Sequence, residues 1–236
     1  MKNSIIILAL LLLSLNSQAQ NLIKNGDFSQ EVTQKVINPS DATPGEWFIL
    51  NNDEKGISTI SYIHDENPKY DGCVQITNVE GKGSIPWYKA LLGQRLKNAG
   101  IETGIYRLSF EAKADKNEAT VGVFIKQTIE KEGIDPATNK NYTTFFVRDA
   151  YDINDDKQIK QSGANYNRKV SDKWTKVYVD FNTGKVINNY YSKNAVKGLT
   201  VSDSDESILN DCYVAIQCLK EGESVRIDNV KFERIK

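Results

Sequence analysis

Short segments of this chain alternate apolar and polar residues, which is the pattern of β-strands that bury one face. Gly, Asn, Asp and Pro residues separate the segments, as they do at turns. Strong helical periodicity is absent. We predict about ten strands, at residues 46–50, 57–63, 73–79, 90–96, 105–114, 121–127, 143–148, 174–181, 212–219 and 225–234.

Two of these segments predict which side chains face away from the core. In residues 105–114 the even-numbered positions are apolar, so Arg107 and Glu111 lie on the opposite face. Residues 174–181 alternate in the same way, with Tyr178 on the polar side. Because one face of each strand packs on the core, the other face either stays in water or lines a binding site.

The last strand changes its alternation part-way along. Val225 and Ile227 share one parity, whereas Val230 and Phe232 share the other. A bulge of one residue near positions 228–229 would bring all four apolar side chains onto the core. We therefore predict a β-bulge there, which would also re-aim the neighbouring polar side chains.

Long polar connections interrupt the series of strands. Residues 128–141 and 150–173 are rich in Asn, Asp and Lys, and we interpret them as loops of an insertion around residues 128–173. Residues 183–211 form a second long connection, with a short helical turn predicted around residues 205–210. Loops of this length in a compact domain are usually functional or disordered.

The number and spacing of the predicted strands favour an all-β fold. About ten short strands with turns between them are typical of two sheets packed face to face, as in a jelly-roll β-sandwich. Such domains often reach about 200–250 residues. We therefore predict a two-sheet jelly-roll β-sandwich that forms a single domain over residues 20–236.

The first 19 residues predict a secretory signal peptide. Lys2 supplies a basic start, residues 5–15 are apolar apart from Ser14, and residues 17–19 fit a small-x-small cleavage site. The apolar run is shorter than the about 20 residues that cross a bilayer. No cysteine precedes Cys73, so no lipid anchor on cysteine is expected after cleavage. We expect a secreted or periplasmic protein without membrane insertion.

Charge and cysteine content give no sign of a nucleic-acid partner or of a disulfide framework. The chain has 30 basic and 31 acidic residues, and this balance gives no sign of a nucleic-acid partner. Three cysteines, Cys73, Cys212 and Cys218, are too few for a disulfide framework. A continuous strand separates Cys212 from Cys218 by about 20 Å, so these two cannot bond, although either might reach Cys73.

Most catalytic arrangements are absent from the sequence. His64 is the single histidine, which excludes any metal site or active site that needs two histidines. No glycine-rich phosphate loop occurs, and neither does the Glu-x-Asp-x-x-Glu strand motif of jelly-roll glucanases. Acidic residues are plentiful, so a dispersed carboxylate pair for glycoside hydrolysis stays open as an alternative.

Several motifs, in order, resemble the carbohydrate-binding modules of families 4, 9 and 22. These modules have galactose-binding-like jelly-roll folds, so the resemblance implies the same fold here. The opening segment with its Asn-Gly-Asp-Phe is similar to the family's Asn-Gly-x-Phe-Glu, and a strand that ends in Glu-Ala-Lys-Ala is the most recognisable part. The matching segments are residues 22–28, 45–47, 92–94, 103–114, 174–177 and 227–230.

The resemblance implies a structural calcium ion between the opening motif and the closing strand. Asp228 matches the aspartate of that strand. Ser29 stands where the family usually has Glu, and whether Asp27 substitutes for that residue is open. Carboxylate and hydroxyl oxygens are hard ligands that suit calcium.

The resemblance also implies a poly- or oligosaccharide ligand, bound by aromatic rings and polar side chains. A tryptophan or tyrosine in a β-sandwich is more often a packing residue than a ligand platform, which applies in particular to Trp47. Arg107 and Glu111 could alternatively form a cross-strand ion pair. The candidate ligand contacts are Trp47, Trp87, Tyr88, Arg107, Glu111 and Tyr178.

We therefore interpret the chain as a secreted, non-catalytic, glycan-binding protein. An alternative is an adhesion protein that binds a protein partner through the insertion around residues 128–173. A second alternative is a glycan-active enzyme with a dispersed carboxylate pair. Exposed aromatic side chains beside Arg107 would favour glycan binding, and two carboxylates in a deep cleft would favour an enzyme.

Overall fold

The computed structural model describes residues 20–51, 56–83, 90–135, 139–152, 167–191 and 210–236. These ranges contain strands and two single-turn 3-10 helices, η1 and η2, with no longer helix among them. Among the described residues, no helix has the length and apolar character needed to cross a membrane. The elements in chain order are β1 (Gln34–Val36), η1 (Pro39–Asp41), β2 (Trp47–Asn51), β3 (Ser58–His64), η2 (Pro68–Tyr70), β4 (Gly72–Asn78), β5 (Ala90–Arg95), β6 (Ile105–Ala114), β7 (Glu118–Asp135), β8 (Lys140–Asp152), β9 (Asn167–Ser171), β10 (Thr175–Tyr191), β11 (Tyr213–Cys218) and β12 (Ser224–Arg234).

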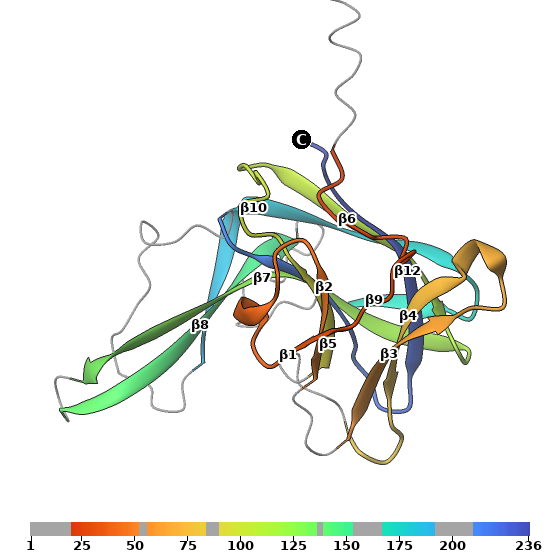
Figure 1. Ribbon diagram of the computed structural model, residues 1–236, viewed down its shortest axis with the longest axis horizontal. Coiled ribbons are helices and arrows are strands. Elements are labelled where there is room, and N and C mark those ends of the chain that lie inside the picture. The colour runs from red at the N-terminus through yellow and green to blue at the C-terminus, as the bar shows by residue number, and fades with distance from the viewer. Residues whose placement is uncertain (1–19, 52–55, 84–89, 136–138, 153–166, 192–209) are drawn as a thin grey trace, which may run out of the picture.

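The strands form a jelly-roll β-sandwich of two sheets, as predicted (Figure 1). Hydrogen-bonded pairing follows the order β1-β2-β5-β11-β7-β8-β10-β6-β12-β4-β3, with β9 paired to β7. We call β3, β4, β12, β6 and the first half of β10 the first sheet, and β2, β5, β11 and β7 the second sheet. The long strands β7, β8 and β10 link the two, because β10 pairs with β6 along its first half and with β8 along its second half.

The core lies between the two sheets and follows the alternation of the sequence. Along β6, Leu108 and Phe110 are buried, and along β10, Val179 and Phe181 are buried. Burying each such side chain contributes about 1.5–3 kcal/mol relative to leaving it in water. The largest fully buried side chains are Phe28, Phe48, Phe110, Phe181, Phe232, Ile76, Leu91, Leu92, Leu108, Ile125 and Ile216.

The predicted bulge in β12 is confirmed. The pairing of β12 with β6 shifts register between Asp228 and Lys231. Asn229 takes a left-handed backbone conformation at this point, with φ of 52°. As a result, the apolar residues before and after the bulge are all buried, namely Val225, Ile227, Val230 and Phe232.

The opening motif packs against this bulge. The backbone N–H of Val230 donates to the carbonyl oxygen of Gly26 at 2.7 Å. Phe28 is fully buried, and its ring lies 5.1 Å from the ring of Trp47. The Trp47 indole N–H in turn donates to the carbonyl oxygen of Asn25 at 2.9 Å. Three segments of the family resemblance therefore meet at one corner, where their role is to hold the fold together.

The prediction that residues 128–141 form a loop is wrong. β7 continues without interruption to Asp135 and pairs with β8 as a hairpin, which extends away from the sandwich in Figure 1. A hairpin outside the sandwich needs no apolar face toward the core, so its sequence carries no simple alternation. β9 (residues 167–171) and the continuation of β10 to Tyr191 were also missed. The helical turn predicted around residues 205–210 lies almost wholly outside the described residues.

The three cysteines are buried free thiols. Burial raises the pKa of Cys73, Cys212 and Cys218 to about 12 in each case. Because the thiolate is the reactive form, these side chains behave as small apolar packing residues.

We predict that Gly26→Ala lowers the free energy of unfolding by about 3 kcal/mol, because a Cβ at this position would lie 2.0 Å from the Val230 carbonyl oxygen. A backbone atom held in the bulge cannot move aside as a side chain would. Urea denaturation followed by tryptophan fluorescence measures the change. Gly81→Ala is the control for backbone strain without a clash: no atom lies within 4 Å of its Cβ position, but its φ is 77°, so it should lose only about 1 kcal/mol. Equal losses in the two variants would contradict the assignment of Gly26 to close packing.

Candidate functional site

The outer face of the first sheet carries a polar strip along β6 and β10. The two strands pair in antiparallel register, with Glu111 opposite Lys176, Ser109 opposite Tyr178 and Arg107 opposite Asp180. Residues in register on paired strands share a face, so these six side chains lie together on the side away from the core. The predicted solvated face of β6 and β10 is thereby confirmed.

Arg107, Tyr178 and Asp180 form a compact group on this strip. The Arg107 guanidinium donates two hydrogen bonds to the Asp180 carboxylate, at 2.7 and 2.8 Å. Its carbon also lies 4.3 Å from the centre of the Tyr178 ring. The Tyr178 side chain is 48% exposed, whereas Asp180 is buried. The pair holds the guanidinium in one orientation over the ring of Tyr178, which is itself about half exposed.

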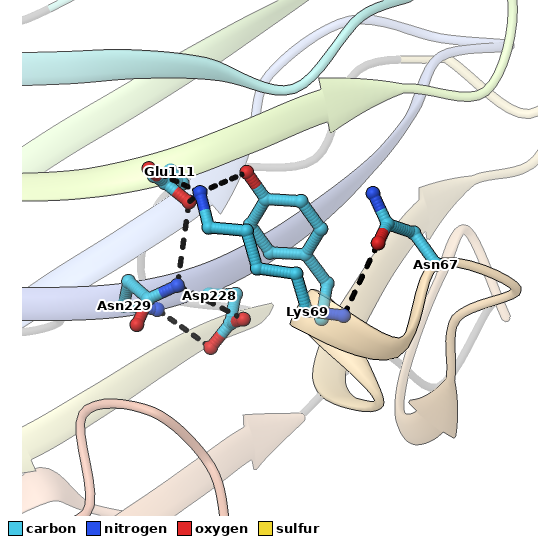
Figure 2. A network of polar contacts seen from close by, with 6 residues as sticks. Asn67, Lys69, Glu111, Asp228 and Asn229 are labelled. Atoms are coloured by element: carbon cyan, nitrogen blue, oxygen red, sulfur yellow. Dashed lines mark hydrogen bonds and ion pairs between the residues drawn. The ribbon is translucent and has the colours of Figure 1, made fainter.

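Glu111 belongs to a second group, which Figure 2 shows. The ammonium of Lys69, from η2, lies 3.3 and 3.2 Å from the two Glu111 oxygens. The side-chain N–H of Asn229 donates to the same carboxylate at 3.3 Å. Burial acts to raise the pKa of Glu111, but hydrogen bonds from Tyr70 and Lys69 outweigh it and leave the pKa below its ordinary value. The alternative of an Arg107–Glu111 ion pair is therefore wrong, since each has another partner.

Asp228 lies opposite Glu111 in register and is 2% exposed. Its carboxylate accepts hydrogen bonds from the backbone N–H of Asn229 at 2.6 Å and from the Asn229 side chain at 3.2 Å. Burial raises the pKa of Asp228 to about 7, and the negative charges of Glu111 and Asp27 act in the same direction. Asp228 and Glu111 thus form a carboxylate pair bridged by Asn229, but substrate has no access to a side chain as buried as Asp228.

The η2 segment covers one end of the polar strip. The ring of Tyr70 stacks on the indole of Trp174, with centres 3.9 Å apart and an angle of 16° between the planes. Tyr70 is 6% exposed, and its hydroxyl accepts a hydrogen bond from Lys69 at 2.8 Å. The Trp174 indole nitrogen is buried without a hydrogen-bond partner in the described part of the chain.

The remaining predicted aromatic contacts divide into two cases. Trp47 is 4% exposed, and its packing on Phe28 leaves no ring face for a sugar, so the structure places it in the core. Trp47 is also among the residues that line a polar depression of about 630 Å³ between residues 24–34 and 44–47. Trp87 and Tyr88 lie outside the described residues, and their role as ligand contacts stays a prediction.

The proposed metal ligands Asp27, Ser29 and Asp228 all take part in hydrogen bonds within the protein. An oxygen of Asp27 accepts hydrogen bonds from the backbone N–H and the hydroxyl of Ser29, at 3.3 and 3.1 Å. Both carboxylate oxygens of Asp228 are engaged by Asn229. In the part of the chain that the structure describes, no group of three or more His, Cys, Asp or Glu residues could hold a metal ion. Calcium binding therefore stays a prediction.

Sequence reasoning missed Asp180, Lys69 and Tyr70. Asp180 shares the parity of Tyr178, so the alternation along β10 was sufficient to find it. Lys69 and Tyr70 lie in a turn more than 40 positions before Glu111, and no local pattern shows that this turn crosses the sheet.

The comparison with protein families identifies the chain. A family described as "Domain of unknown function (DUF4627)" matches residues 21–232. The chain belongs to this family. A comparison with curated proteins finds no match.

One solved structure is similar over nearly the whole chain. It is a protein from Bacteroides thetaiotaomicron VPI-5482, described as a "putative sugar binding protein". It shares 41% sequence identity with this chain, and the alignment covers 91% of this chain and 100% of that protein, with a TM-score of 0.72. Identity and coverage at this level place both proteins in one family.

Carbohydrate-binding modules are also among the matches, at low sequence identity. A CBM4 structure has 18% identity, covers 90% of this chain and 99% of its own, and has a TM-score of 0.47. The CBM22-1 xylan-binding domain of Xyn10C from Paenibacillus barcinonensis has 12% identity, covers 92% of this chain and 96% of its own, and has a TM-score of 0.44. With TM-scores below 0.5, no residue role is carried over from these modules.

We predict that in the presence of a chelator the contribution of Asp228 to the free energy of unfolding falls as pH rises from about 4 to about 7, by at most about 1.4 kcal/mol per pH unit. The folded-state pKa of Asp228 is raised to about 7, so its stabilisation is complete below the unfolded-state pKa and is lost as pH rises through the folded-state value. The side chain of Asp228→Asn does not titrate. The free energy of unfolding of this variant, relative to that of the parent protein, should therefore be higher at pH 8 than at pH 5, as measured from denaturation curves at both pH values. The same difference at both pH values would contradict the assignment.

Proposed function

We propose that this chain is a secreted, non-catalytic protein that binds a poly- or oligosaccharide along the outer face of β6 and β10. The observation that carries the proposal is the exposed ring of Tyr178 beside the fixed Arg107–Asp180 pair. The family relative from Bacteroides thetaiotaomicron, described as a "putative sugar binding protein", supports the same ligand class.

The chemistry of this group suits a sugar ring. One face of a pyranose is lined by C–H groups that pack on an aromatic ring, while its hydroxyl groups need hydrogen-bond donors and acceptors. Tyr178 supplies the ring, and the guanidinium of Arg107 supplies donors beside it. Because Asp180 already holds this guanidinium, little side-chain freedom would be lost on binding.

We keep Trp87 and Tyr88 as proposed further contacts. They lie just before β5, which begins at Ala90 in the second sheet. Glu111 is proposed as a contact only at its accessible edge, since its side chain is 26% exposed and is paired with Lys69.

A protein partner is the second candidate function. The β7–β8 hairpin extends beyond the sandwich in Figure 1, and an extended hairpin offers backbone and side chains to another molecule. Capture of a specific protein by the parent chain, lost when residues 128–147 are replaced by a short turn, would support this candidate in place of glycan binding.

We predict that residues 20–236 are retarded by at least one polysaccharide in affinity electrophoresis through a panel of soluble glycans. Tyr178→Ala should weaken the binding by about fivefold, because loss of an aromatic stacking contact costs about 1 kcal/mol. Tyr178→Phe, which keeps the ring, should retain most of it.

Ile37→Ala is the matched control, since Ile37 is 70% exposed and lies on β1–η1, away from this face. An unchanged affinity in Tyr178→Ala, with binding lost in Trp87→Ala, would move the site away from β10. No retardation by any glycan would overturn the proposed function.

We propose that Asp228 is a ligand of a calcium ion. Support comes from the electrostatic repulsion that Asp27 and Glu111 exert on its carboxylate. Burial has the largest effect on the pKa of Asp228, and the negative charges of Glu111 and Asp27 raise it further. A cation would relieve the repulsion between these carboxylates. An ion at this position would take further ligands from backbone carbonyls and water. At pH 8, millimolar calcium should raise the melting temperature of the parent protein above its value in chelator and leave Asp228→Asn unchanged. Equal melting temperatures with calcium and with chelator would contradict the proposal.

A further inference from the structure

We infer that the indole of Trp174 is a second sugar subsite, which Tyr70 covers in this structure and an oligosaccharide uncovers. The inference rests on the proposed function and adds to it a displaceable cover. Trp174 immediately precedes β10 and lies at the covered end of the polar strip. Tyr178 lies four residues further along the chain, within β10. Four residues of strand span about 13 Å, a distance that several linked sugar rings can bridge.

The stacking of Tyr70 on Trp174 has the geometry of a ligand on a platform. Aromatic side chains usually pair edge-to-face or offset, with ring centres about 4.5–7 Å apart. Here the centres are 3.9 Å apart and the planes differ by 16°. The Tyr70 hydroxyl meets the Lys69 ammonium at 2.8 Å, so a flat ring and a hydroxyl occupy the place where a sugar ring and its hydroxyl would lie.

The cover is anchored firmly at its base. Asp65, whose side chain is 1% exposed, accepts a hydrogen bond from the Arg226 guanidinium at 2.7 Å. The backbone N–H of Asp65 donates to the carbonyl oxygen of Asp71 at 3.3 Å, which closes the turn between β3 and β4. The turn thus starts and ends at fixed points on the first sheet.

The tip of the cover is held by weaker contacts. Its one ion pair joins Lys69 to Glu111, and the Lys69 side chain is 62% exposed. Ion pairs in water contribute little to stability, so the Tyr70–Trp174 stack and the hydrogen bond between Tyr70 and Glu111 are the main contacts that hold the tip. Figure 2 shows Lys69 reaching from η2 across to Glu111, with Asn67 at the start of the short helix. A fixed base and a weakly held tip allow Tyr70 to leave while the sheet stays in place.

The uncovered surface would offer what a sugar needs. Trp174 provides a flat face, and its buried nitrogen is a donor with no partner in the described part of the chain. Glu111 and Asn229 provide an acceptor and a donor beside it. A chain of sugar rings on Trp174 and Tyr178 would therefore lie over Glu111 and Lys176, along the length of the strip.

The test compares ligands of graded length, made from whichever polysaccharide of the panel retards the protein. A cover lowers the apparent affinity by the fraction of molecules that are open, so its removal raises the affinity. Tyr70→Ala should bind the hexasaccharide about fivefold more tightly than the parent protein does, and should bind the monosaccharide with unchanged affinity. Isothermal titration calorimetry measures both.

Lys69→Ala provides a second variant, because it loosens the tip without emptying the space that Tyr70 fills. It should shift hexasaccharide affinity in the same direction, and its matched control, the exposed Lys116→Ala, should not. Acrylamide quenching of tryptophan fluorescence gives a readout without sugar. Quenching should increase in Tyr70→Ala relative to the parent protein, and this increase should vanish when Trp174→Phe is added.

The outcomes separate this inference from the proposed function. Glycan binding that depends on Tyr178 but is unchanged or weakened by both Tyr70→Ala and Lys69→Ala overturns the covered subsite and leaves the proposed function in place. Binding by both proteins, with the hexasaccharide alone bound more tightly by Tyr70→Ala, supports the covered subsite. No binding by either protein overturns both.

Discussion

The contact between the opening loop and the bulge of β12 is the constraint on which the rest of the structure depends. The backbone N–H of Val230 donates to the carbonyl oxygen of Gly26, and a side chain on Gly26 would collide with the carbonyl oxygen of Val230. The bulge changes the parity of β12, so apolar residues on both sides of it reach the same core. It also sets Asp228 opposite Glu111 on the outer face. Packing and surface chemistry are therefore coupled through one irregular backbone position.

Two kinds of polar group lie on the outer face, and they differ in how their charges are balanced. Arg107 and Asp180 pair with two hydrogen bonds and stay beside an exposed ring. Asp228 and Glu111 are two carboxyl groups that lie opposite each other. Burial raises the pKa of Asp228 and so favours its neutral form, while Lys69 and Asn229 stabilise the charge of Glu111. The first group suits recognition of a neutral, hydroxyl-rich ligand. The second group connects the η2 turn to the sheet.

The most recognisable motifs of the sequence serve the fold more than the site. Phe28 and Trp47 pack on each other in the core, although an aromatic pair of this kind could equally have formed a sugar platform. In contrast, Tyr178 follows no motif and stands out only by its parity along β10. A motif records what a family shares, and a shared corner of packing is needed whatever the ligand. The fold was therefore easier to infer than the binding residues.

The sequence by itself determined the all-β class, the strand faces and the bulge near Asp228, because alternation with period two follows directly from strand geometry. It did not determine the β7–β8 hairpin, since strands outside a core need no apolar face. Only the tertiary structure decided that Trp47 is buried, that Arg107 pairs with Asp180 and not Glu111, and that Tyr70 covers Trp174. These contacts join residues distant in the chain, and local patterns contain no information on which strands and turns become neighbours.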